Sequence, residues 1–194
     1  MARVTKPDSY LPICEVDVAA LRERLLAVGE AAWDAEDARK ENRFSCFHHT
    51  RHIIARFIPS NRDPMAFYAT PFWTVWQPLL QPILDRVASH YRLAEPEFPK
   101  VMFARLAAKA GIDRHVDGAG SNLLTHKIHV PLVTSEQVWF EVGDARFQLH
   151  CGQAYELNNV KPHAVRNDGD TDRIHLIFEL FDRSLHSASA EVAH

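Results

Sequence analysis

The chain is expected to fold as a layer of helices followed by an all-antiparallel β-sandwich or small β-barrel. Residues 17–91 contain two stretches in which apolar side chains recur every three or four positions, the spacing of a helix face. After Pro99, short segments of alternating apolar and polar residues are separated by turn sequences such as DGAG, GD and NDGDTD. About six or seven such strands at near-regular spacing are typical of a sandwich or barrel.

Size and composition favour one ordinary globular domain over 1–194. The 194 residues are 46% hydrophobic and 24% charged, which excludes a disordered or collagen-like chain. The net charge of -3 lacks the basic excess typical of nucleic-acid binding, so neither a nucleic acid nor a membrane surface is an expected partner. The first residues, MARVTKPDSYLP, lack the apolar run of a signal peptide, and no C-x-x-C pair occurs. We therefore expect a cytoplasmic protein; the oligomeric state is left open.

The elements are expected in the following order. A helix over 17–39 begins at Asp17 as its N-cap, and a short strand follows in HHTRHIIARF. A second helix over 71–91 contains Pro78 and Pro82, which are expected to kink or divide it. The helical layer thus lies mainly in 17–91, the barrel core in 99–182 and a frayed tail in 184–194.

A candidate metal site begins in the segment DRHVDG. His115 and Asp117 are two residues apart, so on an extended backbone their side chains point to the same face. His163, in KPHAVRN, offers a second imidazole from a strand able to pair beside the first. Two histidines and one carboxylate on one face of a metal suit non-haem Fe(II). The simpler alternative is a loop ion pair between His115 and Asp117.

A candidate anion-binding residue lies ten positions beyond His163. Arg173 opens the strand RIHLIFELF and shares one face with His175 and Glu179, whereas the other face is apolar. A guanidinium beside a metal site provides the fork that binds a small dicarboxylic acid through two hydrogen bonds.

Taken together, the H-V-D of 115–117, the strand THKIHVPL, the segment PHAVRN and the strand RIHLIFELFD resemble one enzyme family. It is the aspartyl/asparaginyl β-hydroxylase-like group of Fe(II)/2-oxoglutarate dioxygenases, to which free proline cis-hydroxylases belong. The resemblance covers roughly 99–182 and, more loosely, HHTRHIIARF. It implies a mainly β fold, a double-stranded β-helix of the jelly-roll or cupin-like kind with N-terminal helices packed on it. It also implies Fe(II), 2-oxoglutarate as cosubstrate, and O2.

The resemblance also implies residue roles. His115, Asp117 and His163 would bind iron, and Arg173 would bind the far carboxylate of 2-oxoglutarate. His129 matches a histidine that contacts the cosubstrate in some members. Because some peptide-directed members lack the carboxylate ligand, Asp117 favours the amino-acid hydroxylases.

Basic residues are candidates for binding a substrate carboxylate. Arg105 interrupts an apolar strand that leads into the metal motif, where an unpaired guanidinium would be costly to bury. It is the first candidate, and an acidic neighbour is the alternative partner. Arg51 and Arg56 come next, although their odd spacing puts them on opposite faces of a strand. For these two a solvated edge-strand role is equally favoured.

Other polar residues are given plainer roles. The histidines of HHTRH cannot easily converge from a strand, so His48, His49 and His52 are expected on the surface or at a pocket rim. Lys127 shares a face with His129, which makes it a candidate for a second carboxylate anchor, but a position at the barrel mouth in water is favoured.

These observations favour a 2-oxoglutarate-dependent hydroxylase of an unactivated C–H in a free amino acid or similar small acid, releasing succinate and CO2. One alternative is hydroxylation of a peptide or protein side chain by the same chemistry, and the size of the pocket is expected to decide between them. Another is a metal-binding, cupin-like protein without oxygenase activity, such as an isomerase or sensor, for which an arginine at 173 would have no purpose.

Overall fold

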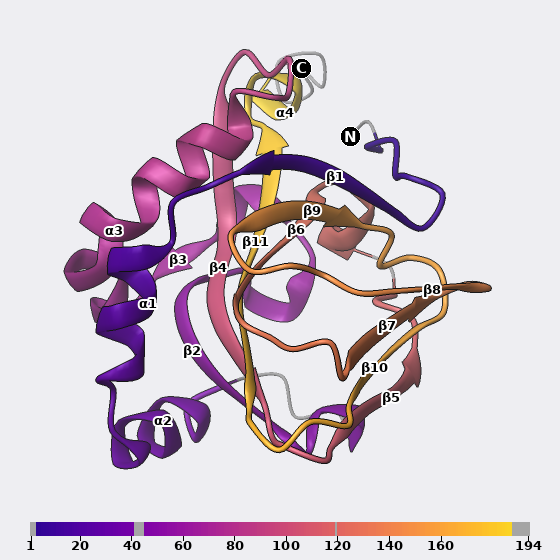
Figure 1. The fold of residues 1–194 in the computed structure, drawn as a ribbon. Coiled ribbons are helices and arrows are strands. Elements are labelled where there is room, and N and C mark those ends of the chain that lie inside the picture. The colour runs from indigo at the N-terminus through magenta and orange to yellow at the C-terminus, as the bar shows by residue number, and fades with distance from the viewer. Residues whose placement is uncertain (1–2, 41–44, 119, 188–194) are drawn as a thin grey trace.

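Two antiparallel sheets dominate the computed structural model, which describes residues 3–40, 45–118 and 120–187. The larger sheet has the order β1-β9-β6-β11-β4-β2-β3 and the smaller one the order β5-β10-β7-β8 (Figure 1). The strands are β1 Tyr10–Glu15, β2 Thr50–Phe57, β3 Tyr68–Ala69, β4 Pro96–Leu106, β5 Gly111–His115, β6 His126–Val133, β7 Val138–Val142, β8 Ala145–Phe147, β9 Gln153–Leu157, β10 His163–Asn167 and β11 Arg173–Asp182. The prediction of a mainly β fold with flanking helices is confirmed.

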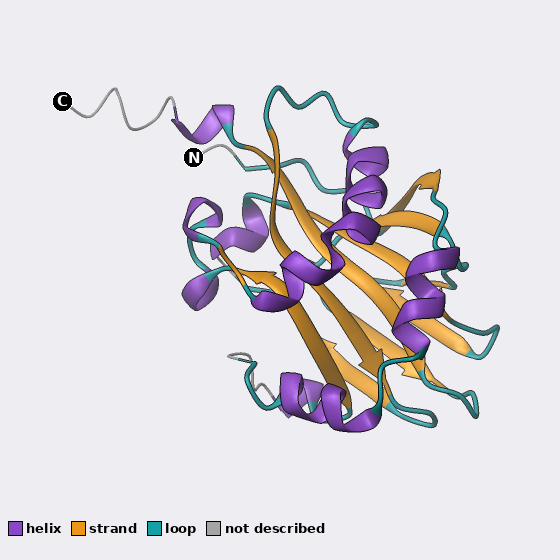
Figure 2. Ribbon diagram, turned by 90° about the vertical axis from the view of Figure 1, so that its left-hand side faces the viewer, coloured by secondary structure: helices purple, strands orange, loops and turns teal. Residues whose placement is uncertain are grey.

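Three helices, α1, α2 and α3, lie on one face of the larger sheet, and α4 follows the end of β11 (Figure 2). The helices are α1 Ala19–Leu26, α2 Glu30–Asp37, α3 Pro71–Ala88 and α4 Ser184–Ser187, with short 3₁₀ turns η1 Ser45–Phe47, η2 Pro59–Asn61, η3 Pro64–Ala66 and η4 Gly120–Leu123. Leu21, Leu80 and Leu84 pack there against Leu176 and Phe178 of β11. This layer leaves the opposite face of β11, β4 and β6 directed toward the smaller sheet.

A second apolar cluster fills part of the space between the sheets. Its buried members include Leu106 of β4, Phe140 of β7, Leu157 of β9 and Val165 of β10. The central strands of the larger sheet therefore separate two environments, helices on one side and the second sheet on the other, and strand parity decides which one a side chain enters.

The helix expected over 17–39 is two helices. The chain is extended at Gly29, where φ is -70° and ψ is 158°, and α2 begins at Glu30. The change of direction lets α2 lie across β2, with Trp33 fully buried. Asp17 is not the N-cap, because that position belongs to Val18, although its carboxylate accepts a hydrogen bond from the backbone of Ala19.

The helix expected over 71–91 is one helix, α3, and Pro78 and Pro82 do not divide it. Both prolines are exposed, as is Thr74, one of the two residues whose carbonyls lose a helix hydrogen bond to them. Water can satisfy these carbonyls on the solvent side, while Trp76, Leu80 and their neighbours hold the opposite side in the core.

The chain ends differ from expectation as well. The sequence pattern indicated no strand in YLPICE, yet β1 pairs with β9 at the edge of the larger sheet. Of the tail expected to fray, residues 184–187 form α4, where Asp182 accepts hydrogen bonds from Ser184, and 188–194 lie outside the described residues. No helix in the described part of the chain is long and apolar enough to cross a membrane.

Candidate active site

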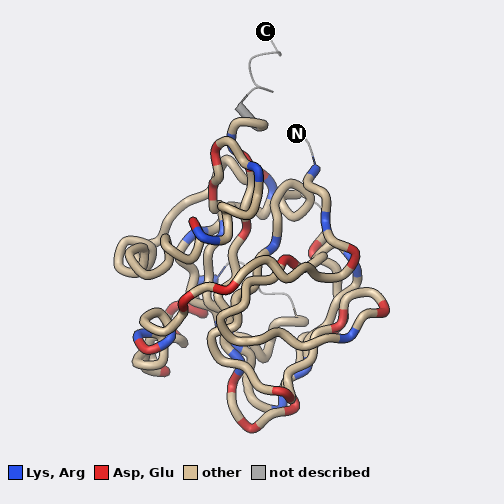
Figure 3. Tube along the Cα trace, turned by 45° about the horizontal axis from the view of Figure 1, so that its top comes forward, with Lys and Arg blue, Asp and Glu red and all other residues tan. Residues whose placement is uncertain are grey.

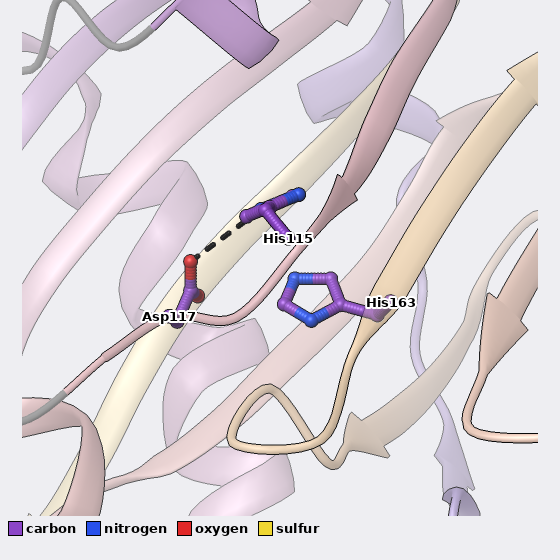
Figure 4. Close-up of side chains that lie close together, drawn as sticks. All are labelled: His115, Asp117 and His163. Carbon is purple, nitrogen blue, oxygen red and sulfur yellow. Dashed lines mark ion pairs between the residues drawn. The ribbon is translucent and has the colours of Figure 1, made fainter.

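Three side chains converge at the end of the smaller sheet where β5 ends and β10 begins (Figure 4). His115 ends β5, Asp117 follows in the loop and His163 begins β10, with the backbones of the two histidines directly paired. One ligand atom from each residue lies within 4.8 Å of the others. Among the described residues this is the one group of three or more His, Cys, Asp or Glu side chains arranged to share an ion.

Backbone carbonyls orient the two imidazoles. Nδ1 of His115 lies 2.7 Å from the carbonyl of Asp113, and Nδ1 of His163 lies 2.9 Å from the carbonyl of Lys161. Each carbonyl accepts a hydrogen bond from the Nδ1–H group, so in the neutral form of each ring Nε2 is unprotonated with its lone pair available. The Nε2 atom of His115 lies 3.6 Å from Oδ1 of Asp117. The two rings therefore have the tautomer that a metal ligand needs.

The carboxylate of Asp117 is held in its ionised form. Oδ2 accepts a hydrogen bond of 3.2 Å from Asn159 and lies 3.5 Å from Nζ of Lys127. Burial by itself would raise the pKa of Asp117, but the charge of Lys127, the neighbouring imidazoles of His115 and His163 and the hydrogen bond from Asn159 hold that pKa well below its ordinary value. A negative ligand is thus available at neutral pH.

Arg173 is buried, and no residue in the described part of the chain supplies it with a counter-ion. Its side chain is only 1% exposed, and neither Nε nor Nη1 has a hydrogen-bond partner. Burial lowers the pKa of Arg173 to about 9. The nearest aromatic contact is Phe140, whose ring centroid lies 5.4 Å from the guanidinium carbon. A buried cation left this way is costly unless an anion completes it.

His129 and His175 form a buried pair next to this guanidinium. Their Nδ1 atoms are 3.4 Å apart, and burial together with the charge of Arg173 lowers the pKa of both rings well below the ordinary value. Both rings are therefore neutral, and one Nδ1 must donate to the other. If His175 donates, His129 carries its proton on Nε2 and is a hydrogen-bond donor, while the unpartnered Nε2 of His175 is only an acceptor.

A cavity of about 1200 Å³ joins these groups. Its lining includes the triad, His129 and Arg173. The apolar part of the wall comes from both sheets and includes Met102, Ile112, Phe140, Val142, Leu157, Val165 and Ile177. Of the three histidines in HHTRH, the lining includes His52, which the sequence placed at a surface or pocket rim.

The expectation that Arg105 points into the cavity is wrong, because the register of the sheet turns it outward. Arg105 is paired with Ile174, which faces the helices, so both side chains share the face opposite to Arg173. Its guanidinium binds Glu30 of α2 at 2.6 Å and Asp172 at 2.5 Å. It belongs to the contact between helix and sheet.

Arg51 and Arg56 also lie outside the cavity lining. Arg51 is paired with Arg105 across β2 and β4 and binds Glu30 and Asp34 of α2. Arg56 follows a β-bulge and binds Glu97 at 2.8 Å, with its guanidinium carbon 4.0 Å from the centroid of Trp73. All three arginines therefore have structural partners.

Two lysines take their place inside the cavity. Lys127, expected in water, is only 15% exposed and lies 3.5 Å from both Asp117 and Glu179. Lys100, which sequence reasoning missed, is 4% exposed and binds Glu179 at 2.8 Å. The available signal for Lys100 was a lysine inside the apolar strand segment FPKVMF, two and four residues from Met102 and Ala104.

The comparisons with known proteins agree with this geometry. The family model for aspartyl/asparaginyl beta-hydroxylase matches residues 78–183, and no curated protein matches. Similar solved structures include AviO1 from Streptomyces viridochromogenes Tue57, 11% identical over 92% of each chain with a TM-score of 0.59. An oxidoreductase of the 2OG-Fe(II) oxygenase family from Burkholderia pseudomallei is 14% identical over 88% of this chain and 93% of its own, with a TM-score of 0.55. A Pseudomonas putida prolyl-4-hydroxylase is 16% identical over 90% of this chain and 93% of its own, with a TM-score of 0.51.

The two facing antiparallel sheets thus form the double-stranded β-helix of the 2-oxoglutarate oxygenases, as predicted. The chain belongs to the aspartyl/asparaginyl β-hydroxylase family. It is an Fe(II)- and 2-oxoglutarate-dependent dioxygenase that uses O2, and this decides against the alternative of a metal-binding protein without oxygenase activity.

The residues present fit both Fe(II) and 2-oxoglutarate. Two imidazoles with free Nε2 atoms and an ionised carboxylate are the donor set that suits Fe(II). The unpartnered guanidinium of Arg173 fits a carboxylate of 2-oxoglutarate.

Proposed function

We propose that the chain hydroxylates an unactivated C–H bond of a free amino acid or a similar small acid, and releases succinate and CO2. The observation that carries this proposal is the buried guanidinium of Arg173, unpartnered at Nε and Nη1, in the same cavity as the histidine–aspartate triad. A cation in that state needs an anionic ligand, and a small dicarboxylate with one end on the metal supplies it.

His115, Asp117 and His163 would hold the iron, and Arg173 would bind the far carboxylate of 2-oxoglutarate. In the tautomer in which His175 donates to His129, Nε2 of His129 is protonated and would donate one further hydrogen bond to the cosubstrate. When bound, Fe(II) and 2-oxoglutarate supply the reaction in which O2 gives one oxygen atom to succinate and the other to the substrate as hydroxyl. The chain's own contribution is to bind and orient both acids.

The charges inside the cavity favour an acidic substrate. Arg173, Lys100 and Lys127 provide three buried cations, and Asp117 and Glu179 provide two carboxylates. Fe(II) and 2-oxoglutarate carry equal and opposite charges and leave this balance unchanged. The lining also has three further cations, Lys40, Arg62 and Arg114, against one further carboxylate, Asp113. An excess of positive charge therefore remains for a substrate carboxylate, and Lys127 and Lys100 replace Arg105 as the groups proposed to bind it.

The apolar wall protects the reaction. Phe140, Val142 and Val165 of the smaller sheet face Ile177 of the larger one across the cavity. Side chains without polar atoms exclude water from the space beside the metal and present no competing hydrogen-bond groups. They also strengthen the attraction between Arg173 and its carboxylate, because the local dielectric constant is low.

One observation favours a second candidate, the hydroxylation of a peptide side chain. The cavity of about 1200 Å³ exceeds the roughly 300–1,000 Å³ of ordinary small-molecule sites, although 2-oxoglutarate occupies part of it. The remaining space accepts a substrate longer than the smallest amino acids. The free carboxylate, which an internal peptide residue lacks, distinguishes the two candidates.

A coupled assay of succinate formation tests the proposal. Each amino acid is offered free and as its N-acetyl amide, with Fe(II), 2-oxoglutarate and O2 present. We expect one free acid to stimulate succinate formation and its amide to fail. Stimulation by the amide alone would favour the peptide candidate.

A further inference from the structure

The N-terminal strap, residues 4–9, is fastened beside the proposed iron site. The backbone N–H of Val4 donates to the carbonyl of Leu123 at 3.1 Å. Asn158 donates three hydrogen bonds to strap carbonyls, from its side chain to Pro7 at 2.8 Å and Asp8 at 3.5 Å and from its backbone to Ser9 at 2.9 Å. Lys161 adds an ion pair to Asp8. The strap therefore has a fixed path across η4 and the loop between β9 and β10.

Lys6 extends from this strap into the protein. Its ammonium donates to the carbonyl of Thr125 at 2.6 Å and to Oδ1 of Asn159 at 2.9 Å. Burial lowers the pKa of Lys6 to about 8. An ammonium has three protons and no acceptor, so the side-chain atom of Asn159 that faces it must be the oxygen.

This contact fixes the orientation of the Asn159 amide. With Oδ1 directed to Lys6, Nδ2 donates to Oδ2 of Asp117 at 3.2 Å and to Oδ1 of Asn122 at 3.1 Å. The reversed amide would place its NH2 against an ammonium and its oxygen against a carboxylate oxygen. Both contacts would be repulsive, so Lys6 determines which end of the amide meets Asp117.

We propose that Lys6 is a positioning residue for the metal site: it acts through Asn159 to hold Oδ2 of Asp117 and thereby directs Oδ1 toward the two histidines. The inference rests on the proposed function, in which Asp117 is an iron ligand. The backbone supports the same path, since the N–H of Asp117 donates to the carbonyl of Asn159 at 3.0 Å. Groups that orient a metal ligand from behind contribute to affinity without touching the metal.

Equilibrium binding of Co(II) alone, without 2-oxoglutarate or O2, measures this role apart from turnover. We expect Lys6→Met to weaken Co(II) roughly 10- to 100-fold, the usual effect of removing such a group. Lys6→Arg keeps a cation at this position, and its affinity for Co(II) is expected to lie within about threefold of the wild-type value. Lys109→Met, which removes an exposed lysine paired with Asp170, is the matched control, with affinity unchanged.

A double-mutant cycle tests whether Lys6 acts on the metal site through Asn159. Asn159→Leu is expected to weaken Co(II) as Lys6→Met does, and the two changes together to cost little more than either one. Full additivity, or wild-type affinity in Lys6→Met, would overturn the inference. If Lys6→Met does not fold, as judged by circular dichroism, Lys6→Gln, whose side chain is one atom shorter, is measured in its place with the same expected loss.

One further variant distinguishes a failure of the proposed iron site from a failure of the proposed role of Lys6. Asp117→Ala is expected to weaken Co(II) more than Lys6→Met does, because it removes a ligand. If Asp117→Ala binds as the wild type does, the proposed iron site is wrong. If Asp117→Ala loses binding and Lys6→Met does not, the role of Lys6 alone is wrong.

Discussion

The two oxygens of Asp117 have different partners, and this difference gives the carboxylate its direction. Oδ2 is held by Asn159 and Lys127, and Oδ1 lies beside His115. Of these contacts, only the spacing of His115 and Asp117 can be read locally from the chain. Asn159 and Lys6 lie 153 residues apart, so no sequence window includes both.

Lys127→Met tests the proposed substrate contact. Loss of a buried, charge-assisted hydrogen bond costs about 1.5–3 kcal/mol, so the KM for the substrate is expected to rise roughly 10- to 100-fold. Substrate-free conversion of 2-oxoglutarate to succinate is expected to continue. Lys109→Met, at an exposed lysine, is the control. An unchanged KM would move the carboxylate site away from Lys127.

Arg105→Ala tests the corrected position of that arginine. Its ion pairs with Glu30 and Asp172 join α2 to β4 and are partly exposed, so the free energy of unfolding is expected to fall by about 1–2 kcal/mol. The KM values for 2-oxoglutarate and substrate are expected not to change. Urea unfolding and the succinate assay measure both quantities. A raised KM with unaltered stability would return Arg105 to the substrate site.

At the scale of the element, α3 shows why helix breakers do not always break a helix. Pro82→Ala restores a backbone N–H donor to the carbonyl of Pro78 on the exposed side of the helix. Proline costs up to about 3 kcal/mol in a helix interior, and its stiffening of the unfolded chain offsets part of that, so we expect about 1–2 kcal/mol of stabilisation. Thermal unfolding measures it, and a lower melting temperature would show that the ring contributes packing.

β11 contains the buried carboxylate of Glu179. Burial alone would raise the pKa of Glu179, but the charges of Lys100 and Lys127 outweigh burial and hold this pKa below its ordinary value of 4.5. Below about pH 4.5 the unfolded chain takes up this proton and the folded chain does not, so stability falls as pH falls. Glu179→Gln is expected to reduce that slope between about pH 3 and 5, while lowering stability at pH 7 because two buried lysines lose their partner. Denaturant unfolding at each pH measures this effect, and an unchanged slope contradicts it.

Strand register, more than strand existence, limited what the sequence could predict. The periodicity of β11 correctly separated Arg173 and Ile177 from Ile174 and Leu176. The outward direction of Arg105 follows only from its pairing with Ile174, a contact that no local pattern encodes. For the same reason β1 was missed, because its short and largely exposed segment owes its conformation to pairing with β9.

At the scale of the whole molecule, the two sheets provide different groups to the cavity. The smaller sheet and the loop after β5 provide His115, Asp117 and His163, and the larger sheet provides Arg173, Lys100 and Lys127. Along the rest of the described chain, Lys and Arg are interspersed with Asp and Glu (Figure 3). The cavity differs from that surface because its cations outnumber its carboxylates. Metal ligands on one sheet thus face anion-binding groups on the other.

The most direct test of this account is the binding of 2-oxoglutarate to the Fe(II)-loaded protein without O2, in wild type and Arg173→Ala. Removing a buried guanidinium from a carboxylate costs about 2–5 kcal/mol, so we expect affinity for 2-oxoglutarate to fall by tens- to thousands-fold while Fe(II) affinity stays the same. Unchanged 2-oxoglutarate affinity in Arg173→Ala would contradict the account, because the cation that defines the cosubstrate site would then have another purpose.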